Sequence, residues 1–290
     1  MTAALVVEAP GLAVTVQDRG RRGARAAGVA VSGWLDAERA ACALRLAGAA
    51  PDAAGLEIGL LGPTLRLDGP RLRLALVGDV AARIRRADGS EDPFAPWTSQ
   101  VLRDGDRLTV AAPRRGPAVL AVAGGLLTPP ELAARATHLR TGLGGLGGRA
   151  LAAGDRLPVA ASADDDDLRL AAPLAEVEGP IRVVLGPQDD RFDPAAVAAF
   201  AATEWTLGRD ADRMGLRLDG PPLAHRGGAD IVSDAVVPGS IQVPGDGRPI
   251  VLLADAQTVG GYAKIATVIA ADLPRLGRLL PGNTLRFAAV

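Results

Sequence analysis

The chain has 290 residues, 48% of them apolar, and its acidic and basic residues nearly cancel to a formal net charge of −1 at pH 7. This length and composition are typical of a soluble globular protein with two ordinary domains or one large β-rich domain. Scattered arginines and few aromatic residues argue against a nucleic-acid partner, and no apolar run is long enough to span a membrane.

The N-terminus and the Cys and His content indicate the cellular location and exclude some kinds of site. The N-terminus lacks the charged start of a signal peptide, so we expect a cytoplasmic protein with no membrane partner. The single cysteine, Cys42, excludes an internal disulfide, and the two histidines, His138 and His225, have no metal-ligand spacing. We therefore expect no metal site within the protein.

The N-terminal segment predicts two short strands over residues 5–16, with a turn at Pro10-Gly11. The polar, glycine-rich segment from Gln17 to Gly33 predicts a long loop. Loops of this length are usually functional or disordered, and this one is too apolar for disorder, so we interpret it as lining a substrate site. A plain surface connection is the alternative.

The next segments predict one helix and then many strands. Residues 36–47 have the spacing of an amphipathic helix that begins at Asp36 and ends at Gly48. From Leu56 to Val159, short apolar runs follow one another at close spacing, which predicts a β-barrel or β-sandwich.

One short unit occurs three times, with a leucine, a Gly-Asp or Gly-Asn pair and then an alternating strand. The pairs are Gly105-Asp106, Gly154-Asp155 and Gly282-Asn283. We interpret the unit as architectural, because polar residues in such turns bond their own backbone. The third copy, near the C-terminus, suggests two related β-modules.

Two further segments have a composition of their own. The glycine-rich run from Thr137 to Arg149 could form a nest of backbone N–H groups for an anion, flanked by Arg140 and Arg149, or be a flexible loop without a ligand. The four consecutive acids at 164–167 are typical of a solvated spacer, and they begin a linker before a strand at 181–186 and a helix at 194–203.

The stretch from Ile241 to Asp272 concentrates the most unusual residues. Two apolar runs around Pro244–Gly247 predict a β-hairpin, and a polar loop, residues 255–264, follows it. This loop ends in Lys264, the only lysine of the chain. An ammonium can bind an anion as a point charge, so we interpret Lys264 as functional; an ordinary exposed lysine is the alternative.

Eight motifs in the same order resemble the allophanate hydrolase subunit 2 family, also described as KipA-like or as the second half of the biotin-dependent carboxyltransferase domain. The motifs are VQDRGRRG (16–23), VSGWLD (31–36), LEIGLLGPTL (56–65), AVAGGL (121–126), GGLGGRAL (144–151), DRMGLRLDG (212–220), GSIQVPGDGRPIVLLAD (239–255) and GGYAKIATVIAADL (260–273). The resemblance implies a mainly β fold of two cyclophilin-like β-barrel modules with a few short helices. We expect modules at 1–165 and 180–290 with a linker at 166–179, and the last strand could pair with the first module.

Stand-alone members of this family are similar to the C component of bacterial ATP-dependent 5-oxoprolinase. The resemblance therefore implies hydrolysis of 5-oxoproline to glutamate with ATP, which could bring Mg²⁺, in a complex with KipI-like and LamB/YcsF-like partner proteins. We expect the chain to be inactive alone.

This reaction needs groups that bind anionic oxygens and a carboxylate that orients water or an amine. The candidate catalytic residues are Lys264, Asp255 and Asp18. The candidate substrate-binding and anion-binding residues are Gln17, Arg19, Ser32, Arg213, Gln242, Gln257, Gly260, Gly261 and Tyr262. We assign anionic oxygens to Lys264 and Arg19, and we expect the early Gln-Asp-Arg segment and the late lysine segment to act on one substrate.

Two other functions remain open from the sequence. The first is the carboxyltransferase component of a biotin-dependent urea carboxylase or allophanate hydrolase system, with biotin carried by another protein. The second is a non-catalytic protein that binds a KipI-type inhibitor, which would need a matching surface and no site.

Overall fold

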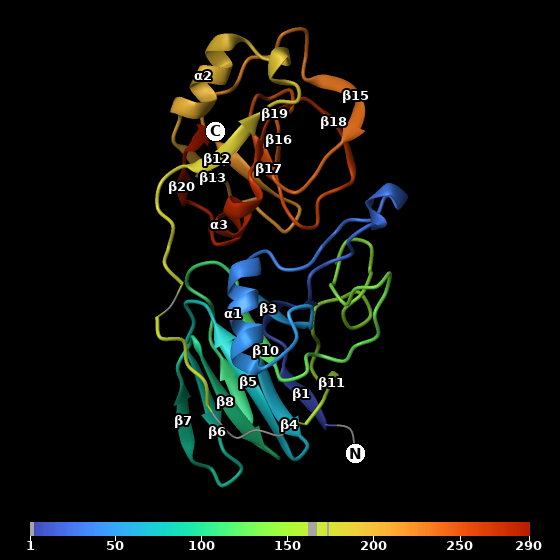
Figure 1. The fold of residues 1–290 in the computed structure, drawn as a ribbon, viewed down its shortest axis with the longest axis vertical. Coiled ribbons are helices and arrows are strands. Elements are labelled where there is room, and N and C mark those ends of the chain that lie inside the picture. Colours follow the sequence, from blue (N-terminus) through green and yellow to red (C-terminus); the bar gives the residue numbers. More distant parts are fainter. Residues whose placement is uncertain (1–2, 162–166, 173) are drawn as a thin grey trace. The chain divides into compact units, whose positions relative to one another are not determined.

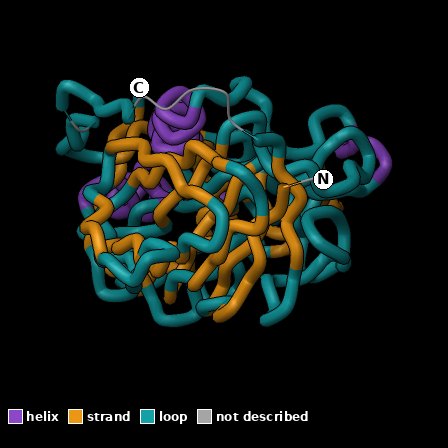
Figure 2. Tube along the Cα trace, turned by 90° about the horizontal axis from the view of Figure 1, so that it is seen from below, coloured by secondary structure: helices purple, strands orange, loops and turns teal. Residues whose placement is uncertain are grey.

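The computed structural model describes residues 3–161, 167–172 and 174–290. Most of the chain is strand and loop, with few helices (Figure 2). Contacts divide it into two compact units, the first made of Met1–Arg21 and Ser32–Ala175 and the second of Arg22–Val31 and Glu176–Val290. The mainly β fold with a few short helices is confirmed. The second unit thus includes a short early segment, residues 22–31, that the sequence placed in the first module.

The first unit contains two antiparallel sheets (Figure 1). In sheet order, the six-stranded sheet consists of β11 (Arg156–Val159), β1 (Ala3–Ala9), β4 (Thr64–Asp68), β9 (Arg107–Val110), β6 (Ala82–Arg85) and β7 (Glu91–Phe94). The five-stranded sheet consists of β2 (Leu12–Gln17), β3 (Gly55–Leu61), β10 (Ala118–Val122), β5 (Arg71–Val77) and β8 (Thr98–Arg103).

Alternation along the central strands explains how the five-stranded sheet is covered on both faces. In β5, Leu72, Leu74 and Leu76 belong to the main core, which also holds inward residues of the six-stranded sheet. The intervening Ala75 and Val77 belong to a second cluster with helix α1 (Ala37–Ala47). Since successive strand residues point to opposite faces, a continuous apolar run is what a strand buried on both faces requires.

The helix α1 begins and ends where the sequence predicts. The Asp36 side chain accepts a hydrogen bond from the Arg39 backbone N–H at 2.9 Å, and Gly48 adopts the left-handed conformation, with φ 71°, that ends the helix. The apolar stripe Ala40, Leu44 and Ala47 is buried. The predicted helix is confirmed.

The three repeated turns have one hydrogen-bond pattern. In each, the Asp or Asn side chain accepts a bond from the backbone N–H three residues earlier, as predicted, and the glycine has a left-handed φ. The glycine N–H then donates to a carbonyl on a neighbouring segment, whose own N–H donates back to the Asp or Asn carbonyl. The receiving residues are Leu67, Val7 and Leu207. The repeat is therefore a way of attaching a turn to a neighbouring strand, and it occurs in both units.

Part of the predicted linker belongs to the first unit. Ser99 in the edge strand β8 exchanges hydrogen bonds with Leu168, and the Leu170 N–H donates to the Trp97 carbonyl at 3.2 Å. These residues cover an otherwise open strand edge, which is the physical reason they do not behave as a solvated spacer. Residues 164–166 of the acidic run lie outside the described residues.

The second unit is built on an eight-stranded sheet that nearly closes on itself, and several of its strands are labelled in Figure 1. In order, its strands are β20 (Thr284–Leu285), β13 (Trp205–Leu207), β14 (Gly215–Asp219), β17 (Ile250–Leu252), β16 (Ser240–Gln242), β19 (Lys264–Val268), β12 (Ile181–Leu185) and β21 (Phe287–Ala289). The first and last strands of this order are separated in sequence by Arg286 alone, so the chain end joins both edges. The possibility that the last strand pairs with the first module is therefore wrong: β20 pairs with β13, and β21 pairs with β12.

Short helices and one two-stranded ribbon complete the second unit. The helices are α2 (Pro194–Ala202) and α3 (Leu273–Gly277), with single 3-10 turns η1 (Ala24–Ala27), η2 (Asp189–Arg191) and η3 (Ala270–Asp272). The ribbon pairs β15 (Asp230–Ala235) with β18 (Val259–Tyr262). The predicted hairpin is confirmed, because β16 and β17 pair. The prediction of a polar loop at 255–264 is partly wrong, since its second half forms β18. The sequence did not indicate this strand because glycines are rare in strands.

Candidate functional site

Lys264 begins strand β19 and is buried, with only 2% of its surface exposed. Its Nζ donates to the Asp234 carboxylate at 2.8 Å and to the Ala235 carbonyl at 3.2 Å. The alternative of an ordinary exposed lysine is therefore wrong. A buried ammonium requires a partner charge, and Asp234 provides it.

Asp234 and Gln188 hold Lys264 in place. The ammonium of Lys264 holds the pKa of the Asp234 carboxyl below its ordinary value, with smaller contributions from the Ala235 N–H and the Gln188 side chain. Gln188 donates to Asp234 at 3.2 Å and accepts the Lys264 backbone N–H at 3.1 Å. Because the Asp234 side chain is about half exposed (49%), the ion pair can exchange with solutes.

Glutamine side chains form the neighbouring part of the cluster. Gln242 on β16 is the register partner of Lys264, so both side chains project from the same face of the sheet. The Gln242 amide donates to the Tyr262 carbonyl and accepts from Gln257, both at 3.3 Å. Gly260 makes room for this arrangement, because a Cβ there would lie 2.4 Å from the Gln242 nitrogen. We call Lys264, Asp234, Gln188, Gln242 and Gln257 the lysine cluster.

Gly260 and Gly261 lie in the β15–β18 ladder, where Gly260 is paired with Asp234. Neither has a left-handed φ. They therefore lack the alternating helical conformation of an anion-binding nest, and a backbone anion site at these two amides stays a prediction.

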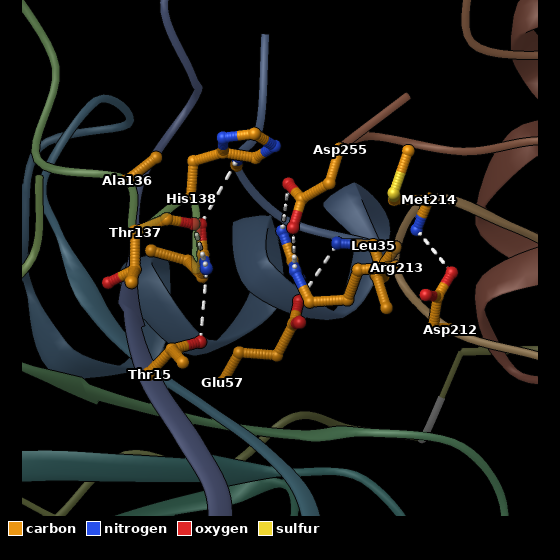
Figure 3. Close-up of polar contacts among 12 residues, drawn as sticks. Thr15, Leu35, Glu57, Ala136, Thr137, His138, Asp212, Arg213, Met214 and Asp255 are labelled. Carbon is orange, nitrogen blue, oxygen red and sulfur yellow. Dashed lines mark hydrogen bonds and ion pairs between the residues drawn. The ribbon is translucent and has the colours of Figure 1, made fainter. Parts of the chain in front are cut away.

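Arg213 and Asp255 form a second polar pair in this unit. The guanidinium donates to both carboxylate oxygens, at 2.9 and 3.2 Å, and the Asp255 N–H donates to the Arg213 carbonyl (Figure 3). Asp255 is 5% exposed, and the Arg213 side chain is 16% exposed rather than lying on an open polar loop. This geometry makes Asp255 a positioning residue for Arg213, since its oxygens already accept two strong hydrogen bonds.

In the first unit, the predicted Gln17 and Asp18 are buried and bonded mainly to the main chain. Gln17 donates to the Thr15 hydroxyl and the Thr137 carbonyl, and it accepts the Gly33 N–H. The Asp18 carboxylate accepts the backbone N–H groups of Gly20, at 2.8 Å, and Arg135. These bonds fix the loop on which the two residues lie.

Ser32 and Arg19 differ in their surroundings. The Ser32 hydroxyl is buried without a hydrogen-bond partner among the described residues, and its φ of 56° is unusual for a residue other than glycine. Ser32 therefore remains a candidate for ligand contact. Arg19 is exposed and contributes no anchored charge.

Glu57, which the sequence analysis did not single out, is also buried in the first unit. It lies on β3 and accepts the Leu35 backbone N–H at 2.8 Å (Figure 3). A buried carboxylate on a strand is a signal that the alternation of polar and apolar residues in LEIGLLG could have revealed.

The glycine-rich loop uses most of its own amides. The N–H groups of Gly142 and Leu143 donate to the His138 carbonyl, and that of Gly144 donates to the Glu131 carboxylate at 3.1 Å. Arg149 pairs with Asp155 through two bonds of 2.7 Å. The loop is therefore an internally bonded structure, which does not support an anion nest at these amides.

Asp234 and Gln188 were not predicted as site residues. Each is distant in sequence from Lys264, by 30 and 76 residues, and neither lies in a recognisable motif. The signal that could have found Asp234 is physical: a lone lysine between two apolar runs needs a carboxylate partner.

The described residues offer no metal-binding group of three or more His, Cys, Asp or Glu side chains. No helix within the described ranges is both long and apolar enough to cross a membrane. The lysine cluster combines three amide side chains with one ammonium, which is paired with the Asp234 carboxylate. Once a ligand replaces Asp234 at the ammonium, the set can bind an oxyanion and both polar atoms of an amide.

Comparisons with known proteins agree on one family. The carboxyltransferase domain, subdomain A and B, family model matches residues 27–289. The chain is 38% identical to the C subunit of 5-oxoprolinase from Escherichia coli (strain K12), over 96% of this chain and 88% of that protein.

Two solved structures are similar over 99% of the chain. The crystal structure of TTHA0988 has a TM-score of 0.87 and 34% identity, and the chain spans about half (56%) of it. The Kluyveromyces lactis urea carboxylase structure has a TM-score of 0.88 and 29% identity, and the chain covers 27% of it. With the family match and the relative of similar length, the chain belongs to the carboxyltransferase domain (subdomain A and B) family.

Proposed function

We propose that the chain is the C subunit of an ATP-dependent 5-oxoprolinase. The complex would open the lactam of 5-oxoproline to glutamate with ATP cleavage, and it would contain KipI-like and LamB/YcsF-like subunits. The observation that carries the proposal is the lysine cluster, where a buried ammonium lies beside three glutamine amides.

The chemistry of 5-oxoproline suits this set of groups. The substrate has one carboxylate and one lactam amide, so it needs a cation and a paired donor and acceptor. Lys264 provides the cation, and the side-chain amides of Gln242 and Gln257 provide both hydrogen-bonding types. ATP-dependent activation places negative charge on the lactam oxygen, which a positioned ammonium or guanidinium stabilises. Arg213, oriented by Asp255, is the second cation for this role.

The identities of the relatives favour an oxoprolinase component. The chain is 38% identical to the C subunit of 5-oxoprolinase from Escherichia coli and 36% identical to that from Haemophilus influenzae. It is 29% identical to the Kluyveromyces lactis urea carboxylase structure. The higher identity therefore supports the first function.

A carboxyltransferase component of a urea carboxylase system is the second candidate. It is supported by the TM-score of 0.88 to Kluyveromyces lactis urea carboxylase. In that case biotin would reach the chain on a separate carrier protein, and Lys264 and the glutamine amides would contact its polar ureido ring. Lys264 is the only lysine in the sequence and is buried, so it is not suited to carry biotin itself.

Reconstitution tests the proposal directly. The purified chain is mixed with the KipI-like and LamB/YcsF-like proteins encoded by the same organism, and glutamate and ADP are measured with 5-oxoproline and MgATP. We expect turnover in the full mixture and none when this chain is omitted. Carboxylation of urea with a biotin carrier and a biotin carboxylase, without 5-oxoproline turnover, would favour the second candidate. Binding to the KipI-like protein with neither activity would overturn both enzymatic functions.

A further inference from the structure

The loop of residues 22–31 carries an arginine into the second unit. It groups with that unit although both its sequence neighbours, Arg21 and Ser32, belong to the first. Its centre is the single 3-10 turn η1, flanked by Gly23 and Gly28, which have φ values of 89° and 78°. Since these left-handed positions favour glycine, the loop has a defined shape, and Arg25 lies within it.

Arg25 is held only weakly by the protein. Its Nη2 donates to the Thr258 carbonyl at 3.5 Å, and the same carbonyl accepts the Val236 N–H at 3.1 Å. Its Nη1 is buried without a hydrogen-bond partner among the described residues. Burial lowers the pKa of the guanidinium. A guanidinium carries five N–H donors, and among the described residues one weak hydrogen bond to the side chain of Arg25 is found.

Other arginines of the second unit differ from Arg25, because their guanidinium groups are paired with carboxylates. Arg213 has two hydrogen bonds to Asp255, and Arg182 has two to Asp272 through its side chain. By contrast, no carboxylate among the described residues pairs with Arg25. An uncompensated cation that is partly removed from water attracts an anion more strongly than an exposed one does.

Backbone hydrogen bonds at one end of the β15–β18 ribbon connect Arg25 with the lysine cluster. Lys264 donates to Asp234 and to the Ala235 carbonyl, while Arg25 donates to the carbonyl that bonds the next residue, Val236. The Arg25 partner, Thr258, is thus hydrogen-bonded to the residue that directly follows Asp234 and Ala235, the two partners of Lys264. Thr258 itself follows Gln257 of the cluster directly.

We propose that Arg25 is an oxyanion-binding residue that completes the lysine cluster, and that it takes a carboxylate or phosphate oxygen pair at the Thr258 end of the β15–β18 ribbon. The proposal deepens the proposed function and rests on it for the identity of the substrate site. A guanidinium matches the spacing of two oxygens on one carboxylate or phosphate, which an ammonium does not. This assigns to Arg25 the role that the sequence analysis gave to the exposed Arg19.

The test measures oxyanion binding to the full-length chain by isothermal titration calorimetry in low-chloride buffer. 5-Oxoproline serves as the carboxylate probe and inorganic phosphate as the phosphate probe. We expect Arg25→Ala to weaken binding of at least one probe about tenfold, and Arg25→Lys to retain part of the affinity because it keeps the charge. Arg22→Ala is the matched control, since Arg22 lies in the same loop and is exposed. Melting temperatures of all variants check folding.

The probes and controls separate the outcomes. Loss for 5-oxoproline alone identifies the ligand as a carboxylate, and loss for phosphate alone identifies it as a phosphate. Equal affinities of wild type and Arg25→Ala, equal losses in Arg25→Ala and Arg22→Ala, or no binding of either probe to the wild type would overturn the proposal.

The binding measurement and the activity measurement can fail separately. If Arg25→Ala loses phosphate affinity while the reconstituted complex never converts 5-oxoproline, Arg25 stands as an oxyanion site and the proposed function fails. If the complex is active and Arg25→Ala leaves both KM and affinity unchanged, the function stands and the assignment of Arg25 fails.

Discussion

In the first unit, Gln17 and Asp18 are as buried as Lys264 is in the second, but their hydrogen bonds go to different kinds of partner. Asp18 accepts two backbone N–H groups, and Gln17 bonds one backbone carbonyl, one backbone N–H and the Thr15 hydroxyl. The Lys264 ammonium bonds the Ala235 carbonyl and, at a shorter distance, the side chain of Asp234, which is itself half exposed. Bonds to the main chain can break only if the loop moves, whereas a side-chain partner can be exchanged for a ligand. Burial alone therefore does not identify a catalytic residue.

The strongest test of this difference is Lys264→Met in the reconstituted complex. We expect kcat to fall about 10²–10³-fold, the usual cost of removing one charge-stabilising group, because methionine keeps the length of the side chain without its charge. The melting temperature should change by no more than a few degrees, since Asp234 can reach water. Arg248→Met is the control, because it removes an exposed cation from the same unit. Unchanged turnover in Lys264→Met would remove the lysine cluster from the reaction.

Asp18→Ala should act on stability instead. It leaves the N–H groups of Gly20 and Arg135 without their acceptor. A buried group costs about 1–3 kcal/mol, and because these two are part-buried we expect the lower part of the sum, a loss of about 2–4 kcal/mol. Chemical denaturation of the isolated chain measures this loss. A stable Asp18→Ala protein that has lost turnover would contradict the structural role and return Asp18 to the catalytic candidates.

Asp272 forms another ion pair in the second unit, with Arg182, for which we expect a structural role. It is buried and accepts hydrogen bonds from the backbone and side chain of Arg182, which, as the main cause, holds the pKa of Asp272 below its ordinary value. Because the pKa of Asp272 is lower in the folded than in the unfolded protein, its ionised carboxyl stabilises the fold at pH values above the unfolded pKa of about 4. This contribution is lost as the pH falls through the folded pKa. Asp272→Asn should therefore cost about 2 kcal/mol at pH 7, from lost charged hydrogen bonds.

The pH dependence distinguishes this role from a general packing defect. The stability difference between wild type and Asp272→Asn should shrink in unfolding curves recorded below about pH 4. A difference that is constant from pH 7 to pH 3 would mean that ionisation of Asp272 is irrelevant. Turnover per folded molecule should be unchanged at pH 7, in contrast to Lys264→Met.

Gly260→Ala is the mildest change and refines the boundary of the lysine cluster. Its Cβ would lie 2.4 Å from the Gln242 nitrogen, so the Gln242 side chain must move, and we expect KM to rise about threefold to tenfold with a stability cost of about 1 kcal/mol. Gly261→Ala is a close control, because the nearest atoms to its Cβ would be 3.8 Å away. Equal effects of both substitutions in steady-state kinetics would indicate a general loss of ribbon flexibility, with no special role for Gln242.

Local features of the fold could be predicted from the sequence, because each depends on neighbouring residues. Asp36 and Gly48 fix the ends of α1, and the three Gly-Asp or Gly-Asn turns satisfy their own backbone. Strand β18 was missed because its two glycines are poor strand formers and pair only through a distant segment.

The candidate site could be predicted only in part. Lys264, Gln242 and Gln257 were identified from their residue types, and the structure brings them together. Asp234, Gln188 and Arg25 could not be found in this way, since their contacts join residues 30, 76 and 233 positions apart. Polar residues in loops look alike in a sequence, and only the fold decides whether a carboxylate such as Asp255 contacts a ligand or an arginine.

The early loop of residues 22–31 has a consequence for how the protein is made. Arg25 leaves the ribosome before Thr258, 233 residues later in the sequence, and the last strands that close the eight-stranded sheet emerge later still. At a synthesis rate of about 5–20 residues per second, the loop waits roughly 10–50 s for its contacts. Throughout that interval a cationic segment is exposed on a nascent chain whose first module can already fold, so the final shape of the site is a late event in biosynthesis.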